Sequence, residues 1–274
     1  MRFKTLFYNI VFIVGSLLLI VNVYGLSQNI RVDDFDNQYL RFTDDQPQDF
    51  DTTIVELIRN QDENEIDYAT RITKVVARGI SHIEWLNFPP EKFNQLIPIW
   101  ENYFIYFMGI FSGIPEYQRY HFANYHRSLE RGIGLCGDAS MVISQLLDEQ
   151  SIQNKILTFP GHVVVLAFFA NGRQFILDGD FGIVAPYSLA EVSDKSNEIA
   201  QLYVDAGYTQ GDYRFIRKML QKKSRQWDGV QHFITNKYYF EKVSYWLKWP
   251  TPFFLILFSI YMIRKLEQKN LNKK

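Results

Sequence analysis

The sequence predicts an α+β fold, in which a mostly helical N-terminal half packs on a small antiparallel sheet and an apolar helix lies at each end of the chain. Apolar residues recur at helical spacing in several segments, of which 64–80 is the clearest. Two runs of β-branched and aromatic residues, 163–169 and 174–177, are joined by a short turn signal. Two charge-free apolar segments, 6–26 and 249–263, flank these elements.

Length and composition fit one domain with a real core. The chain has 274 residues, of which 47% are hydrophobic, and this is ample to bury such a core. Its 29 basic and 30 acidic residues give a formal net charge of −1, which excludes the basic balance typical of nucleic-acid-binding proteins. A single cysteine allows no internal disulfide.

The first apolar segment predicts a membrane anchor over residues 1–27. Residues 6–26 are 21 residues without a charge, and about 20 such residues span a bilayer as a helix. Arg2 and Lys4 precede the segment, which favours a cytoplasmic N-terminus. The alternative is a cleaved signal peptide, although Val23-Tyr24-Gly25 is a poor cleavage site.

The second apolar segment predicts a further membrane helix within residues 245–274. Its 15 residues reach only about 22 Å as a helix, but Lys248, Arg264 and Lys265 extend it by snorkelling. Pro250 and Pro252 fall in its first turn, where proline is tolerated. The alternative is an amphipathic or core-packed terminal helix. We therefore expect a two-pass protein of the cell membrane with both termini cytoplasmic and residues 28–244 outside the cytoplasm.

Between the anchors the chain alternates solvated and helical segments. Residues 33–51 are acidic and predict a solvated connector. Residues 91–111 predict a long helix with an aromatic stripe, and residues 213–226 predict a helix with a basic face. The other predicted helices are 52–60, 64–80, 117–129 and 188–204.

The single cysteine, Cys136, stands where a glycine-rich approach meets a helix. Residues 131–140 read Arg-Gly-Ile-Gly-Leu-Cys-Gly-Asp-Ala-Ser and lead into an apolar-periodic segment. The first N–H groups of a helix lack internal partners and carry the positive end of its dipole. A thiolate is stabilised at that place, and the thiolate is the nucleophile.

His162 and Asp178 complete the arrangement, which resembles the transglutaminase-like superfamily. His162 opens one predicted strand and Asp178 ends the next. The resemblance covers about residues 131–182 and implies a papain-like core at about 54–190. It implies that Cys136 is the nucleophile, His162 the base and Asp178 the carboxylate that orients the imidazole.

The register of the two strands tests this arrangement. A two-residue loop at Asn171-Gly172 would place His162 opposite Phe181 and put Asp178 on the wrong face. A three-residue loop, or a bulge at Gly172, places His162, Asp178 and Asp180 on one face. We therefore expect an odd loop. In that register Asp180 is as close to His162 as Asp178 is, and only the resemblance favours Asp178.

Each residue also has a simpler interpretation. A lone cysteine is most often a small core side chain, a strand histidine can be structural, and Asp-Gly often ends a strand. A zinc site formed by Cys136, His162 and Asp178 is a third alternative, but no short-spaced ligand pair supports it.

The resemblance implies acyl transfer from an amide or ester carbonyl, without a cofactor or a metal. The same layout serves transglutaminases, peptidases and deglycosylating amidases, so the acyl acceptor stays open between water and an amine. From the topology we expect peptides or amide-containing polymers of the envelope or cell surface as partners, together with membrane lipid and no nucleic acid. The alternative is a catalytically idle binding or assembly module. Val163-Val164 supports it, because the superfamily usually has a small and then an aromatic residue there.

Overall fold

The computed structural model describes residues 2–31, 40–41 and 45–271 and shows a mixed α+β architecture with a small antiparallel sheet. The chain divides into two compact units. The first comprises Met1–Ile30, Pro90–Tyr120 and Tyr239–Lys274, and the second comprises Arg31–Pro89 and His121–Tyr238. Much of the predicted connector 33–51 lies outside the described residues.

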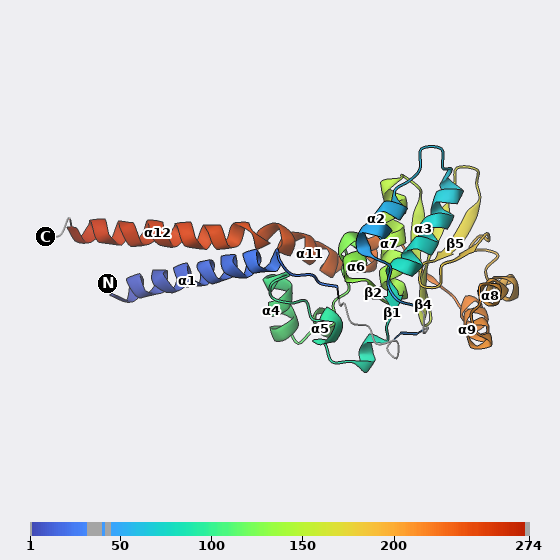
Figure 1. The fold of residues 1–274 in the computed structure, drawn as a ribbon, viewed down its shortest axis with the longest axis horizontal. Helices are drawn as coiled ribbons and strands as arrows, with labels where there is room; N and C mark the ends of the chain where they lie inside the picture. The colour runs from blue at the N-terminus through green and yellow to red at the C-terminus, as the bar shows by residue number, and fades with distance from the viewer. Residues whose placement is uncertain (1, 32–39, 42–44, 272–274) are drawn as a thin grey trace. The chain divides into compact units, whose positions relative to one another are not determined.

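Figure 1 shows the fold and labels most of its elements. The strands are β1 (Ser81–His82), β2 (Ile133–Gly134), β3 (Asn154–Phe159), β4 (His162–Phe168), β5 (Gln174–Asp178), β6 (Ile183–Ala185) and β7 (Arg225–Trp227). The helices are α1 (Arg2–Gly25), α2 (Phe50–Leu57), α3 (Glu65–Gly79), α4 (Tyr103–Phe111), α5 (Pro115–Gln118), α6 (Tyr125–Arg131), α7 (Cys136–Glu149), α8 (Ser196–Asp205), α9 (Gln210–Leu220), α10 (Val230–Phe233), α11 (Thr235–Lys248) and α12 (Pro250–Leu271), with short 3₁₀ turns η2 (Trp85–Asn87) and η3 (Lys92–Asn94).

In the first unit, α1 and α12 lie side by side and antiparallel, so that the start of α1 lies beside the C-terminal part of α12 (Figure 1). A Cβ atom on Gly15 would lie 2.9 Å from Leu255 Cβ, so glycine allows the two helices to approach closely. Nearer the other end of the pair, Asn22 Nδ2 donates a hydrogen bond to the Lys248 carbonyl at 2.8 Å.

Of the described helices, α1 is long and apolar enough to cross a membrane, over Phe3–Gly25. A signal sequence near the N-terminus also meets this criterion of length and apolarity. Helices α11 and α12 meet at a bend of 47° and reach the required length and apolarity only when they are taken together. Helix α12 begins at Pro250, so Pro250 and Pro252 are in its first turn, as predicted.

The sheet of the second unit has the strand order β6-β5-β4-β3-β7, and each neighbouring pair is antiparallel. Helices α3 and α7 cover one face, where Val165 belongs to their core. Helices α8 and α9 cover the other face against Val164 and Ile176 (Figure 1). Because side chains alternate along a strand, His162 and Asp178 lie on the face of α8 and α9.

Sequence patterning predicted α3 well. Apolar side chains on one stripe of α3 are buried, and Asn64 caps its first turn by accepting a hydrogen bond from the Asp67 N–H at 3.0 Å. The predicted helix 52–60 is displaced toward the N-terminus, because Asp49 caps α2 by accepting from the Thr52 N–H at 2.9 Å.

The predicted long helix at 91–111 is wrong. Only its last part, α4, is an α-helix, and it starts after Asn102, whose side chain accepts from two N–H groups of the first turn. Pro98 disfavours helical geometry at the residue before it. Phe93 and Asn94 have positive φ angles of 61° and 51°, which excludes a regular helix through that segment.

The predicted helix 117–129 is interrupted between α5 and α6, because Asn124 caps the start of α6 by accepting from the Arg127 N–H at 3.3 Å. The predicted helix 188–204 begins only at α8. The predicted helix 213–226 also differs, because α9 ends at Leu220 and residues that follow form the edge strand β7.

Candidate active site

The start of α7 fixes Cys136. Strand β2 pairs in parallel with β1 and leads through the extended residue Leu135 into the helix, of which Cys136 is the first residue. Asp138 Oδ2 accepts the Leu135 N–H at 2.8 Å and closes the first turn. A Cβ on residue 134 would lie 2.7 Å from Asp138 Cβ, so Gly134 is required here. Cys136 is therefore at the start of a helix, as predicted, and its side chain is half-buried.

The hairpin of β4 and β5 has the predicted odd loop. Phe168 pairs with Gln174, and the Phe169 N–H donates to the Arg173 carbonyl at 2.9 Å. Residues 170–172 form a three-residue loop, in which Gly172 adopts a φ of +81°. This register brings His162 and Asp178 to the same face.

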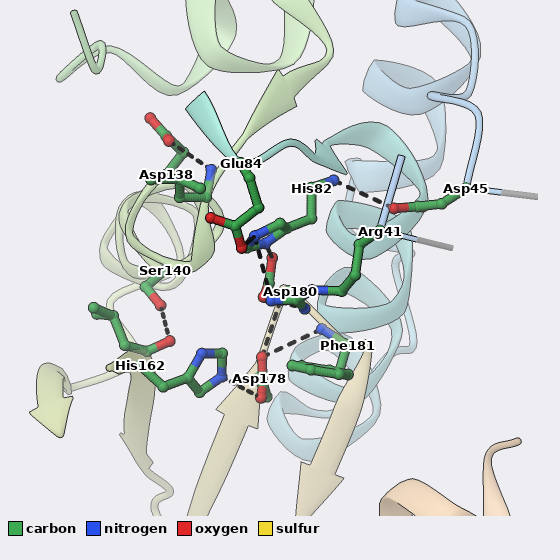
Figure 2. Close-up of polar contacts among 12 residues, drawn as sticks. Arg41, Asp45, His82, Glu84, Asp138, Ser140, His162, Asp178, Asp180 and Phe181 are labelled. Atoms are coloured by element: carbon green, nitrogen blue, oxygen red, sulfur yellow. Dashed lines mark hydrogen bonds and ion pairs between the residues drawn. The ribbon is translucent and has the colours of Figure 1, made fainter. Parts of the chain in front are cut away.

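His162 and Asp178 form a buried pair. His162 Nε2 lies 2.7 Å from Asp178 Oδ2, as the sequence analysis expected (Figure 2). The Tyr203 hydroxyl donates to the same oxygen at 2.7 Å. Asp178 Oδ1 accepts the N–H groups of Asp180 and Phe181 at 3.0 and 3.3 Å. The carboxylate is therefore held at both oxygens, and the imidazole is fixed by it.

Cys136 contacts the same imidazole and influences its charge. Complete burial lowers the pKa of His162 most strongly, but it is outweighed by the charge and hydrogen bond of Asp178 and by those of Cys136. The pKa of His162 therefore lies well above its usual 6.5. Since Nε2 is bonded to Asp178, Nδ1 is the ring nitrogen that remains for the thiol.

Two aromatic side chains enclose the imidazole. The rings of Phe181 and Phe215 meet His162 edge-on, with centroid distances of 5.6 and 6.2 Å. Phe181 follows β5, and Phe215 comes from α9. These rings shield the imidazole from water on two sides, which strengthens its electrostatic interaction with Asp178.

Asp180, the alternative to Asp178 as the partner of His162, pairs with a second histidine. His82 Nδ1 lies 2.8 Å from Asp180 Oδ1, and Arg41 Nη1 donates to Oδ2 at 2.8 Å (Figure 2). Burial acts to raise the pKa of Asp180, but the hydrogen bond and charge of His82, with the charges of Arg41 and His162, lower it to about 2. Asp180 therefore serves His82, and Asp178 serves His162.

A third histidine–carboxylate contact supports the start of α7. His121 Nδ1 lies 2.7 Å from Asp138 Oδ2, and its ring stacks on Trp85 at 4.3 Å. Burial raises the pKa of Asp138 most, but His121, Arg131 and the Leu135 N–H together lower it. No sequence pattern indicated this role of His121, or the roles of Tyr203 and His82.

The described residues contain no group of three or more His, Cys, Asp or Glu side chains arranged to hold a metal ion. Compared with known proteins, the chain matches no family model, no curated protein and no solved structure.

Proposed function

We propose that this protein is a membrane-anchored enzyme that transfers acyl groups from amide carbonyls through a thioester at Cys136. The observation that carries the proposal is the buried His162 imidazole, which contacts Asp178 on one side and the half-buried Cys136 on the other. A structural histidine needs neither a thiol partner nor a carboxylate that is held by three further donors.

In the proposed reaction, the Cys136 thiolate attacks the amide carbon and forms a tetrahedral oxyanion. His162 gives its Nδ1 proton to the leaving nitrogen, the C–N bond breaks, and the thioester remains. Water or a second amine then attacks the thioester, transfers its proton to His162 and releases the thiolate. Asp178 keeps the ring oriented and stabilises its charged form throughout.

Two donors serve the oxyanion. The Cys136 N–H is at the first position of a helix, where it has no intrahelical partner. The Trp85 indole N–H is buried and has no hydrogen-bond partner among the described residues. Its ring stacks on His121, whose partner Asp138 is in the first turn of α7. We assign Trp85 as the second donor.

Alkylation of the only thiol tests the proposal. Iodoacetamide should modify Cys136 faster in the native protein than in His162→Ala, because the imidazole of His162 next to the thiol can accept its proton. Hydroxylamine added with candidate envelope peptides should capture the acyl group as a hydroxamate in the native protein and not in Cys136→Ala. Equal alkylation rates in the native protein and in His162→Ala, together with no captured acyl group, would contradict the proposal.

The competing candidate is a binding or assembly module with an idle site. Val163 and Val164 favour it, because they stand where the resembled superfamily has a small and an aromatic residue. Both pack in apolar clusters, so they shape the strand and not a substrate surface. An unreactive Cys136 in a correctly folded protein would make this module the better account.

We further propose that α1 and the α11–α12 pair both cross the cell membrane, with both termini cytoplasmic. Arg2 and Lys4 flank the start of α1, and Arg264, Lys265 and Lys269 follow the apolar part of α12. The outward position of the second unit makes envelope peptides or surface polymers the expected substrates. Topology reporters fused to each terminus and within the second unit test this, and an exported C-terminus would refute the two-pass arrangement.

A further inference from the structure

Helix α4 exposes an apolar face in the unit that contains α1 and α12. Phe107, Ile110 and Phe111 are 41%, 44% and 77% exposed, and the helix contains no charged residue. Its other side is buried through Tyr103 and Ile105. Large exposed side chains of this kind on one short helix mark an interaction surface.

The start of α4 is tied to the place where α1 ends and α12 begins. The Lys248 carbonyl, at the junction of α11 and α12, accepts hydrogen bonds from the Tyr103 hydroxyl at 2.9 Å and from Asn22 of α1 at 2.8 Å. Gly25, the last residue of α1, contacts the Trp100 carbonyl so closely that a side chain would collide with it. Helix α4 therefore begins at the level of a membrane surface, if α1 and α12 span the bilayer.

We propose that α4 lies in the membrane–water interface and inserts Phe107, Ile110 and Phe111 among the acyl chains. The inference rests on the membrane placement of α1 and α12 proposed above. In Figure 1, α4 runs crosswise to these two helices, as an interfacial helix does.

Lipid is the occupant that fits this face. Among the described residues, the large apolar side chains that are exposed belong to the unit of α1, α4 and α12, with four exceptions. These exceptions are Val55, Ile58, Leu86 and Phe215. The apolar face of α4 therefore resembles the exposed surface of α1 and α12, which the proposed bilayer covers.

Spin labels on the full chain in lipid nanodiscs test the placement of α4. After Cys136→Ser, single cysteines replace Phe107, Phe111, Ile13 of α1 and Val55 of the second unit, and each carries a nitroxide. Labels at Phe107 and Phe111 should collide with oxygen more often than with a water-soluble nickel complex. The ratio of the two collision rates should lie between the ratios for the Ile13 and Val55 labels.

Each other outcome overturns the inference. A label at Phe111 that is as accessible to nickel as the Val55 label would place α4 in water. A label shielded from both quenchers would mean that protein covers it. An Ile13 label accessible to nickel would refute the membrane placement of α1 itself, and this result separates a failure of the proposed localisation from a failure of the α4 inference.

An independent observation concerns α9, the helix that brings Phe215 to His162. Lys218 follows Phe215 by three positions, so the two side chains lie on the same side of the helix. A cluster of six exposed cations on and after α9 has no carboxylate partner among the described residues. Its members are Arg214, Arg217, Lys218, Lys222, Lys223 and Arg225.

We infer that this basic cluster selects substrates that carry an anionic group, a carboxylate or a phosphate, near the reacting carbonyl. The inference deepens the proposed function and rests on it. Unpaired cations beside a partly enclosed site raise the local concentration of anions, and this effect weakens with salt.

Two alkylating agents, one anionic and one neutral, test the basic cluster. Anionic iodoacetate and neutral iodoacetamide react at the same thiol, so the ratio of their rates reports the electrostatic potential at Cys136. Arg214→Gln with Lys218→Gln should lower the ratio about threefold, and salt should lower it in the native protein. Lys195→Gln is the matched control, because Lys195 is exposed and pairs with Glu198.

A ratio that the double variant does not change would overturn the role of α9. The iodoacetamide rate alone reports the Cys136–His162 pair, so failure of the proposed function is visible separately. If Lys195→Gln lowered the ratio of the two rates as much as the double variant does, the effect would be one of general charge. This result would also overturn the inference.

Discussion

Two buried histidine–aspartate pairs lie side by side in this protein, and their surroundings differ. His162 meets Asp178 at 2.7 Å and His82 meets Asp180 at 2.8 Å, with the two aspartates separated by one residue. The remaining ring nitrogen of His162 is available to a thiol. The corresponding nitrogen of His82 lies 3.3 Å from both Glu84 and Arg41.

The difference shows that the third partner, and not the pair itself, determines what the histidine can do. A thiol is a nucleophile that needs a base, so the first pair can move a proton. Neither Glu84 nor Arg41 is a nucleophile that a base would activate, so we interpret the second pair as a structural clamp. That clamp holds the turn whose Asp180 and Phe181 N–H groups bind Asp178.

Removing each histidine should separate the two roles most clearly. His162→Ala removes the proposed base and should lower acyl transfer by about 10²–10⁴, and it should slow alkylation of Cys136 near pH 7. His82→Ala should leave the shape of the alkylation profile unchanged but cost about 1–3 kcal/mol of unfolding free energy, because the buried Asp180 loses a partner. Equal effects of both variants on alkylation would contradict the comparison.

Removing each aspartate charge gives the next largest contrast. In Asp178→Asn, the amide oxygen stays on the two backbone N–H groups, so the NH₂ group faces His162 Nε2. The ring must then carry its proton on Nδ1, where it cannot accept a proton from the thiol or from water. Acyl transfer should fall by about 10²–10⁴ with little change in thermal stability.

Asp180→Asn should act on stability in acid. The folded pKa of Asp180 is about 2, below its unfolded value, so its stabilisation is present above about pH 4 and is lost as the pH falls toward 2. Thermal unfolding in detergent micelles should therefore show a smaller loss of stability between pH 4 and pH 2 in the variant than in the native protein. The same slope in both would show that Asp180 is not the clamp.

Removing the proposed oxyanion donor of Trp85 should separate the reactivity of the thiol from acyl transfer. Trp85→Phe keeps an aromatic ring against His121 and removes the indole N–H. It should lower acyl transfer by about 10²–10³. Alkylation of Cys136 forms no oxyanion, so its rate should not change. A parallel fall of both rates would show that Trp85 supports the fold and donates nothing to the oxyanion.

The candidate site was more predictable than the helices around it. Cys136, His162 and Asp178 lie within one local unit of helix and hairpin, and alternation along the strands fixed the loop length in advance. Asp180 could not be separated from Asp178 by alternation, because its choice of partner depends on His82, which is 98 positions away in sequence. Arg41 is more distant still, and no sequence spacing links it to this turn.

The errors in the helices have local causes. Pro98 lies within the predicted helix 91–111 and argues against a continuous helix there. The prediction relied instead on the spacing of the aromatic residues. Asn124 is a typical helix cap inside the predicted helix 117–129. Strand β7 had no such signal, because an edge strand of three residues gains its structure from pairing with β3.

Tyr203→Phe should have a smaller effect than the aspartate variants. Burial, with the charge and hydrogen bond of Asp178, raises the pKa of Tyr203 well above 10, so its hydroxyl stays a donor to Asp178. Removing it takes one of four partners from the carboxylate, and a neutral hydrogen bond contributes about 0.5–1.5 kcal/mol. Acyl transfer should fall about threefold to tenfold. Tyr208→Phe is the control, because its hydroxyl donates to the Phe181 carbonyl and not to Asp178.

Asp45→Asn should give the smallest change, and its sign should be opposite to that of Asp180→Asn. Asp45 accepts the His82 N–H at 3.2 Å, and burial is the main cause that raises its pKa to about 6. A carboxyl whose folded pKa exceeds its unfolded value stabilises the fold below about pH 4, and this contribution is lost as the pH rises through 6. Asparagine keeps the acceptor oxygen without the charge. The variant should therefore unfold at a higher temperature than the native protein at pH 8 and at nearly the same temperature at pH 4. A lower unfolding temperature at pH 8 would mean that the Asp45 charge supports the clamp, as that of Asp180 does.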